Sequence, residues 1–324
     1  MTPPFPQPAA TVAPPMLGAG ADAGTVSGGL SATLADGARL VRPKIALMVL
    51  ATVATAFWLT AGRPDDTAAL LWLLLGTALV AASSSIANQI LERASDRLMP
   101  RTADRPLAAG RLSVANAWLA TAALLAVGAV VCTLSGGWPA AAAAVGTWLL
   151  YVVAYTPLKR VSPVNTAVGA VAGALPVAIG WLAADGPARL AAGDPRGTVA
   201  AAALGAVLYL WQFPHFMAIA WLYRRQYAAA GLKMLTVVDP SGLRAAGQSL
   251  AAALAMIPAS LALAVPSAGI RLFLAAALAS IVYALASVRF AVRRDDASAR
   301  TLLLTSLGSL LGLLTAAVVF GRPL

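Results

Sequence analysis

Three oxygen-bearing side chains recur at intervals of four residues where a long apolar stretch ends: Asn88, Glu92 and Asp96. Residues four apart lie on one face of a helix, so these side chains are expected to point the same way. Carboxylate and amide oxygens suit Mg²⁺, a hard cation that often completes its coordination with water and phosphate oxygens. The spacing therefore indicates a metal site; the alternative is that these groups only cap a helix end and solvate a loop.

Basic residues follow this stripe directly, at Arg97, Arg101 and Arg105. Ionisable groups at membrane depth are expensive and usually line a polar cavity or an ion path. Carboxylates alone would fit an ion relay in a transporter, whereas carboxylates followed by arginines indicate a metal-bridged anion. Their place at the rim of an apolar stretch favours a reaction chamber that opens to one side.

A second polar group lies between two later apolar stretches and consists of Tyr155, Lys159, Arg160 and Asn165. Lysine offers a point charge and arginine a planar fork of donors, so we expect this group to supply further contacts to the same anion. The alternative is that the two basic residues only orient the chain in the membrane.

The single histidine, His215, follows Pro214 inside another apolar stretch. A lone histidine on an apolar helix is often a hydrogen-bonded packing residue. Otherwise it contacts a ligand or moves a proton, because its charge changes near neutral pH. The residues around it leave these alternatives open.

The elements that carry these residues are long and apolar. The chain has 324 residues, of which 60% are hydrophobic and only 11% charged, and its mean hydropathy is +0.80; soluble domains have roughly 25% charged residues. Crossing a hydrocarbon core of about 30 Å takes roughly 20 helical residues. We predict an all-α, polytopic membrane helical bundle of about nine transmembrane helices, near residues 44–62, 68–87, 114–134, 138–157, 163–184, 198–222, 246–265, 270–290 and 301–320.

The basic residues predict the orientation of this bundle. Most of the 23 lysines and arginines fall in alternate connections, and the other side keeps only Arg63, Arg189, Arg196, Arg271 and Arg322. Cytoplasmic loops carry the excess of lysine and arginine, so the N-terminus is expected in the cytoplasm of a bacterial cell, with the protein in the inner membrane. The connections 92–113 and 223–245 are the most charged, which predicts an active site facing the cytoplasm.

Residues 1–38 are rich in Pro, Ala and Gly and lack the basic and apolar regions of a cleavable signal peptide. We expect a disordered cytoplasmic tail there and a transmembrane domain at 39–324. The net charge is +11, but the basic residues lie at the ends of apolar stretches and form no extended basic surface for nucleic acid. One cysteine, Cys132, excludes an intramolecular disulfide and a cysteine metal site.

The stretch 88–107 resembles the first aspartate-rich motif of the UbiA superfamily of intramembrane prenyltransferases. Its ending, Met-Pro-Arg-Thr-Ala-Asp-Arg-Pro-Leu, is similar to the branch of that family that farnesylates heme. Further segments agree with the same branch: Arg42-Pro-Lys44, Tyr155-Thr156-Pro-Leu-Lys159-Arg160 through Asn165, Trp211-Gln212-Phe-Pro214-His215-Phe216, and Tyr227 to Leu235. The resemblance covers nearly all of the chain after residue 38.

In that family the first motif holds Mg²⁺ and a diphosphate, so the resemblance implies that Asn88, Glu92 and Asp96 are catalytic metal ligands. The implied substrates are farnesyl diphosphate and heme b, and the implied activity is Mg²⁺-dependent transfer of the farnesyl group to a heme vinyl group. Membrane lipid surrounds the protein, and a downstream heme A synthase is an expected partner. Substrate-binding residues carried over by position are Arg101, Arg105, Tyr155, Lys159, Arg160, Asn165, Gln212, Arg224, Gln226 and Tyr227.

His215 follows the family pattern, whereas Gln226 departs from it. His215 is implied as a catalytic residue that contacts the heme iron or a propionate, or that handles a proton. Gln226 stands where the family usually has an acidic residue before the tyrosine. An amide offers oxygen but no charge, so we expect the first motif to carry more of the metal binding.

Two other functions fit part of this pattern. A prenyltransferase of the same family could use an aromatic or quinone-precursor acceptor instead of heme. A heme-binding assembly protein without catalysis would retain heme but release no diphosphate. Labelled farnesyl diphosphate, offered with either acceptor, separates these alternatives.

Overall fold

The computed structural model describes residues 30–61, 67–267 and 269–321, and every regular element in this part of the chain is a helix. In order these are α1 (Leu30–Val41), α2 (Pro43–Ala61), α3 (Thr67–Arg97), α4 (Val114–Leu149), the π-helix η1 (Leu150–Tyr155), α5 (Thr156–Leu158), α6 (Asn165–Ala174), α7 (Pro176–Ala183), α8 (Gly186–Ala191), α9 (Arg196–Leu222), α10 (Arg224–Ala229), α11 (Leu235–Val238), α12 (Leu243–Ala262), α13 (Ile270–Arg293) and α14 (Asp296–Phe320). The predicted all-α class is confirmed.

Helix α1 begins inside the segment that the sequence predicts as a disordered tail, residues 1–38. Residues 1–29 of that segment lie outside the described residues. The tail and the domain boundary at residue 39 therefore stay predictions.

Helix α4 contains a reversal of the chain. Eight stretches of the described residues are long and apolar enough to cross a membrane, and one of them, Val114–Leu158, has 45 residues, about twice the length that one crossing takes. Gly137, inside it, has φ 77° and ψ 165°. The Ser83 hydroxyl donates to the carbonyl of Thr121 at 2.8 Å and accepts from Nε1 of Trp148 at 2.9 Å. Thr121 and Trp148 therefore lie at one level, and the stretch supplies two crossings, as predicted.

Two further helices are interrupted on the way to the site. The predicted span 163–184 is divided at Pro176, where α6 ends and α7 begins, because proline lacks the N–H that a continuous helix needs. The second half of the α4 hairpin ends in η1, whose wider turn lets the Thr156 hydroxyl donate to the carbonyl of Tyr151 at 2.8 Å. Single π-helical turns of this kind recur at functional sites.

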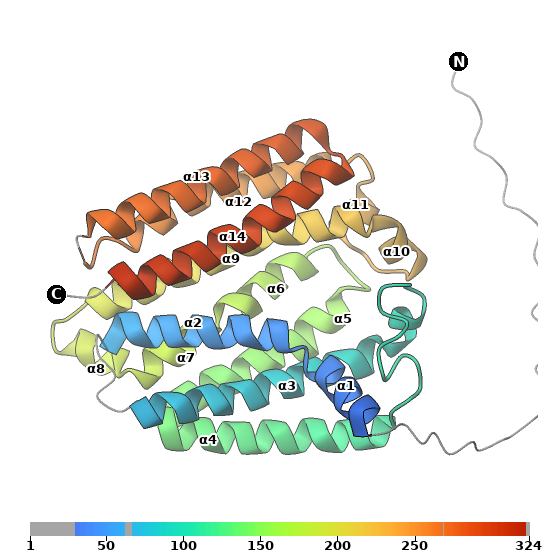
Figure 1. The fold of residues 1–324 in the computed structure, drawn as a ribbon, viewed down its shortest axis with the longest axis horizontal. Helices are drawn as coiled ribbons and strands as arrows, with labels where there is room; N and C mark the ends of the chain where they lie inside the picture. The colour runs from blue at the N-terminus through green and yellow to red at the C-terminus, as the bar shows by residue number, and fades with distance from the viewer. Residues whose placement is uncertain (1–29, 62–66, 268, 322–324) are drawn as a thin grey trace, which may run out of the picture.

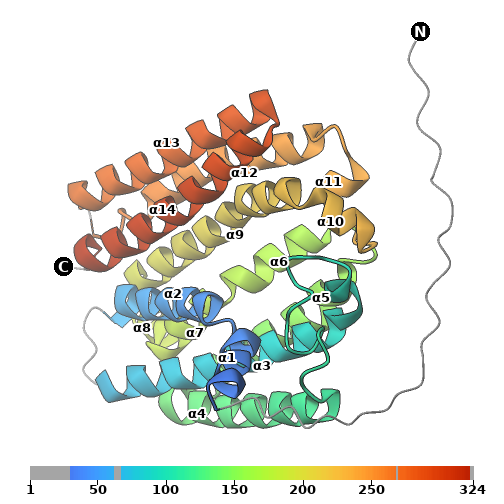
Figure 2. The ribbon, with the colours of Figure 1, turned by 45° about the vertical axis from the view of Figure 1, so that its right-hand side comes forward.

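The largest buried cluster surrounds α9 and includes Leu204, Met217 and Tyr283. Helices α9, α12, α13 and α14 form one part of the bundle, and α2, α3, α4 and α7 form the other (Figures 1 and 2). Small residues let the helices approach closely, as is common where lipid offers little drive for association. A Cβ atom added at Gly76 of α3 would lie 2.7 Å from Sγ of Cys132 on α4.

The two most charged connections lie at the same end of the bundle. Figure 1 shows α1, α5, α10 and the segment between α3 and α4 at one end, while α8 lies at the other. The ends of α3, η1 and α9 meet there, so residues far apart in the sequence are brought together around the last turns of α3.

Candidate functional site

The last three turns of α3 carry the predicted oxygen stripe, and all three side chains are buried. Asn88, Glu92 and Asp96 are 0%, 9% and 1% exposed. The Asn88 amide nitrogen donates to the Thr156 hydroxyl at 3.0 Å, which turns Oδ1 the other way. That oxygen has no hydrogen-bond partner among the described residues.

The segment after α3 folds back over the stripe. The Thr102 hydroxyl donates to the carbonyl of Asp96 at 3.0 Å, and Nε of Arg97 donates to the carbonyl of Ala108 at 2.7 Å. These bonds hold the loop so that Arg105 returns to Asp96, nine residues earlier in the sequence.

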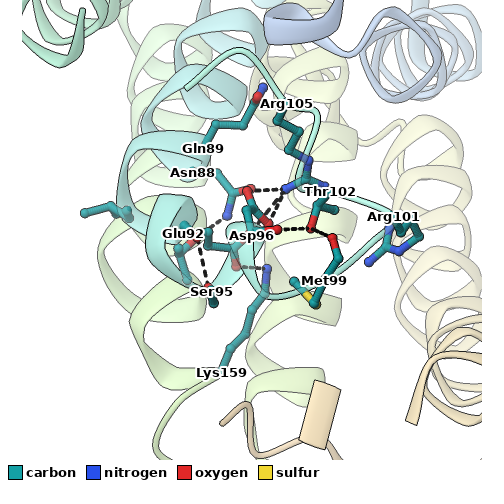
Figure 3. A network of polar contacts seen from close by, with 12 residues as sticks. Asn88, Gln89, Glu92, Ser95, Asp96, Met99, Arg101, Thr102, Arg105 and Lys159 are labelled. Atoms are coloured by element: carbon teal, nitrogen blue, oxygen red, sulfur yellow. Dashed lines mark hydrogen bonds and ion pairs between the residues drawn. The ribbon is translucent and has the colours of Figure 1, made fainter. Parts of the chain in front are cut away.

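Figure 3 shows two carboxylates interleaved with two cations. Nη1 of Arg105 lies 2.8 and 2.7 Å from the two oxygens of Asp96 and 3.9 Å from Oε2 of Glu92. Nζ of Lys159 lies 2.6 Å from Oε1 of Glu92. The structure therefore unites the predicted acidic stripe with the predicted basic residues from two separate segments.

Both cations of this cluster are partly desolvated. Burial lowers the pKa of Lys159, but the Glu92 carboxylate more than offsets this and holds that pKa above its usual value. For Arg105, burial and the neighbouring Arg42 lower the pKa, while Asp96 raises it. An arginine remains protonated in proteins, so the site keeps both positive charges at neutral pH.

Arg42 is a site residue that the sequence did not single out. It is the residue between α1 and α2, its φ is 52°, and its buried Nη2 has no hydrogen-bond partner among the described residues. Three bonds secure α1 beside it: Arg111 to Asp36 at 2.8 Å, Arg39 to Asp104 at 2.6 Å, and Nε2 of Gln89 to the carbonyl of Leu40 at 2.8 Å. A strained, non-glycine residue with a free buried donor fits anion binding.

The second predicted group reaches the same place in part. Nζ of Lys159 lies 4.3 Å from the centre of the Tyr155 ring, and Asn165 donates to the carbonyls of Ser162 at 2.7 Å and of Lys233 at 3.3 Å. Arg160 is exposed and donates to the carbonyl of Leu91 at 3.3 Å. Lys159 therefore joins the carboxylates directly, whereas Asn165 ties α6 to the segment before α11.

Helix α10 adds an aromatic side to the cluster. Arg101 donates to the Tyr227 hydroxyl at 3.4 Å and lies 4.6 Å from the centre of the Tyr223 ring. Burial raises the pKa of Tyr227, so its hydroxyl is neutral and able to donate. Oε1 of Gln226 is buried and has no hydrogen-bond partner in the described part of the chain.

Three predicted residues make their contacts elsewhere. Gln212 donates to the carbonyls of Ala170 and Leu208, both at 2.9 Å, and Arg224 bonds to Asp296 at 2.8 Å. Nδ1 of His215 lies 2.7 Å from the Ser306 hydroxyl. Roles for these three residues in substrate binding or catalysis stay predictions.

Thr156, Arg42 and Tyr223 are the contacts that sequence reasoning missed. Thr156 and Arg42 lie inside motifs that were recognised, so their place in the site could have been inferred from their neighbours. Tyr223 gave no such signal, because its ring contacts Arg101 only through the folding of two distant segments.

The oxygen set fits a magnesium ion. Asn88 offers a buried oxygen without a partner, and Glu92 and Asp96 offer carboxylates beside it. No group of three His, Cys, Asp or Glu residues that could hold a metal occurs in the described residues. A site with two carboxylates and an amide leaves coordination positions for water and phosphate oxygens, which is the usual arrangement for Mg²⁺.

Comparisons with known proteins identify the family of this chain. Residues 49–317 match the UbiA prenyltransferase family, and the chain belongs to that family. It is similar to the protoheme IX farnesyltransferase of Rhodopirellula baltica, with 40% identity over 276 residues that cover 83% of this chain and 93% of the relative.

Solved structures share the fold. A digeranylgeranylglyceryl phosphate synthase aligns with a TM-score of 0.69 at 17% identity, covering 90% of this chain and 99% of the other. A UbiA homologue from Archaeoglobus fulgidus, bound to GPP and Mg²⁺, aligns with a TM-score of 0.61 at 18% identity, covering 88% and 100%. The helices of this protein are therefore arranged as in that family.

Proposed function

We propose that this enzyme transfers the farnesyl group of farnesyl diphosphate to a vinyl group of protoheme IX (heme b) and releases diphosphate. The acceptor follows from the similarity to protoheme IX farnesyltransferases. The product would be heme O, the precursor of the heme of cytochrome oxidases, and a heme A synthase is the kind of enzyme that would consume it.

The observation that carries the proposal is the pairing of two buried carboxylates with two cations beside an unpartnered amide oxygen. Asn88, Glu92 and Asp96 would hold Mg²⁺, as the homologue bound to GPP and Mg²⁺ suggests. Bound there, the ion would neutralise the charge that develops on the departing diphosphate. Arg105, Lys159 and Arg42 would contact the phosphate oxygens in the same desolvated site, where each charge interaction counts for more than in water.

In this transfer, C1 of the farnesyl group exchanges its bond to oxygen for a bond to carbon. The bond between C1 of the farnesyl group and the diphosphate oxygen breaks, and both electrons leave with the diphosphate. The terminal carbon of the heme vinyl group forms a bond to C1, which leaves a positive charge on the vinyl carbon next to the ring. Water adds to that carbon and loses a proton. The protein holds the two substrates in register and keeps water from the farnesyl cation until the new bond has formed.

The orientation of the molecule is part of the proposal. The end of the bundle that carries the carboxylates also carries the lysine- and arginine-rich connections. Since such connections face the cytoplasm, the active site is proposed to open to the cytoplasmic side of a bacterial inner membrane.

The test is a product assay on membranes that contain the protein. Labelled farnesyl diphosphate is supplied with heme b or with an aromatic acid, each with Mg²⁺ or with a chelator. We expect label in heme only, and only with Mg²⁺. Labelled aromatic product with unchanged heme would show that the acceptor is an aromatic acid and not heme. Transfer that is unaffected by chelation would reject the metal site.

A further inference from the structure

His215 is the single histidine of the chain and lies on α9, where it contacts its own helix and α14. Its ring stacks on Trp211, with ring centres 4.7 Å apart and planes inclined by 23°. Nδ1 lies 2.7 Å from the Ser306 hydroxyl. The other hydrogen bonds of Ser306 decide which of these two groups is the donor.

The Ser306 hydroxyl lies 2.6 Å from the carbonyl oxygen of Leu303 and donates to it. Two oxygens at this distance need a hydrogen between them, because otherwise their lone pairs would face each other. A hydroxyl has one hydrogen, so Ser306 accepts from His215, and Nδ1 carries the ring proton. In a neutral imidazole the lone pair is then on Nε2, which has no hydrogen-bond partner among the described residues.

The surroundings hold this ring in place. Nε1 of Trp211 donates to the carbonyl of Ser306 at 2.7 Å, and the Tyr283 hydroxyl donates to the carbonyl of Trp211 at 2.8 Å. Ser306 and Tyr283 are fully buried. Three helices therefore fix the direction in which the Nε2 lone pair points.

We propose that Nε2 of His215 binds the iron of the heme acceptor as an axial ligand. The inference rests on the proposed function, because it takes heme as the acceptor. Histidines that bind metals usually donate their other ring N–H to an oxygen, which fixes the tautomer and makes the ligand more basic. His215 and Ser306 form this arrangement, and heme iron is commonly held by such an imidazole.

A role of His215 as proton acceptor fits these contacts less well. An imidazolium at this position would lie against Trp211, Phe216 and a serine hydroxyl. No aspartate or glutamate of the described residues forms an ion pair with it. Even a partly buried charge is costly without an opposite partner, so the site favours the neutral ring, which is the form that binds iron.

The test is spectroscopic and uses the whole protein in lipid nanodiscs, purified through a tag without histidine and loaded with heme b. Because the chain has one histidine, an iron–imidazole stretching band in the resonance Raman spectrum of the ferrous protein must come from His215. We expect the band in the wild type, its loss in His215→Gly, and its return when imidazole is added to His215→Gly. A wild type without the band, or a band that persists in His215→Gly, would overturn the ligation.

A second pair of variants tests the hydrogen bond. Ser306→Ala removes the acceptor of the Nδ1–H bond and is expected to weaken heme binding about 10- to 100-fold. Ser309→Ala, at a buried serine one turn further along α14, should leave heme affinity unchanged. Mg²⁺-dependent binding of farnesyl diphosphate, measured in every variant, shows that the bundle has folded. Equal heme affinity in the two serine variants would contradict the arrangement.

Failure of the ligation and failure of the proposed function give different results. A wild type that farnesylates heme but shows no iron–imidazole band would overturn the ligation alone. A wild type that binds no heme and prenylates an aromatic acid would overturn both.

Discussion

Lys159 and Glu92 form an ion pair in which each residue keeps the other charged. Their side chains are 14% and 11% exposed, and the two charged atoms are 2.6 Å apart. Burial alone lowers the pKa of a lysine, and in Lys159 it is chiefly the Glu92 carboxylate that reverses this. While Glu92 is ionised, the raised pKa of Lys159 therefore stabilises the fold below the unfolded pKa of lysine, and this contribution is lost as pH rises through the higher folded pKa.

Glu92→Gln should reverse the direction of the Lys159 pKa shift. Without the carboxylate, burial acts with little opposition, so the pKa is expected to fall below the ordinary lysine value of about 10.4. NMR titration of lysines labelled with ¹³C at Cε measures this directly, and Lys159→Arg identifies the signal. A Lys159 pKa that stays above the ordinary value in Glu92→Gln would show that another group holds the charge.

Asp96→Asn should impair the reaction through the metal. It keeps the shape of the side chain but removes a charge from the proposed Mg²⁺ site, and a loss of turnover of about 100- to 1,000-fold is expected for a group that stabilises charge in the transition state. Part of the activity should return at high Mg²⁺, because mass action offsets a weaker site. Asp194→Asn, on an aspartate at the other end of the bundle that bonds to Arg196, is the control and should keep full activity.

The sequence predicted the acidic stripe and its cations better than it predicted their pairing. The spacing of Asn88, Glu92 and Asp96 follows from helix geometry alone. The link from Glu92 to Lys159, 67 residues later, depends on how two helix ends meet, which no local pattern contains. Arg42 is a different case, because it lies inside a recognised motif and its place in the site could have been inferred from its neighbours.

Helices α3 and α4 approach each other closely at two glycines, Gly76 and Gly128. A Cβ atom at Gly76 would lie 2.9 Å from the backbone nitrogen of Cys132, and one at Gly128 would lie 2.9 Å from the carbonyl oxygen of Gly76. These neighbours are backbone atoms, which cannot turn aside as a side chain can. The two helices therefore need glycine at both positions.

Gly76→Ala and Gly128→Ala should each destabilise the protein by about 1 to 3 kcal/mol, the usual cost of overpacking. Gly146→Ala is the matched control, because a Cβ atom there meets nothing within 4 Å and alanine favours helix by about 0.5 to 1 kcal/mol. Unfolding by titration with a denaturing detergent compares the three variants. A Gly128→Ala protein as stable as Gly146→Ala would mean that α3 and α4 can move apart without a loss of stability.

Sequence reasoning located the helices well but not their interruptions. Both crossings inside α4 were predicted, because the apolar stretch is long enough for two and glycine and proline mark the reversal at Gly137. The same reasoning predicted one uninterrupted span at 163–184, although Pro176 divides α6 from α7. The π-helix η1 has no marker in the sequence, because its register depends on the helices packed around it.

At the scale of the whole molecule, the connections rich in lysine and arginine lie at the end of the bundle that carries α1, α5 and α10, and α8 lies at the other end (Figure 1). The predicted orientation follows from this difference. Family membership and the shared fold support the bundle itself, but a fold has no inherent direction across a membrane. Orientation therefore needs its own measurement.

Single cysteines measure the orientation in intact cells. With Cys132 replaced by alanine, Ala109→Cys lies on the exposed connection after α3, and Ala192→Cys lies on the exposed end of α8. A membrane-impermeant maleimide should label Ala192→Cys in intact cells, whereas Ala109→Cys should react only after the membrane is opened. The opposite pattern would place the carboxylates on the outer side.

The junction at Arg42 has a practical consequence for anyone who attaches a reporter protein to this enzyme. One residue separates α1 from α2, and each helical residue turns the following chain by 100°. Inserting one alanine beside Arg42 would rotate its guanidinium away from Glu92 and Asp96. It would also strain the three bonds that hold α1. A reporter should therefore be attached ahead of Leu30, where extra length does not alter the rotational setting of Arg42.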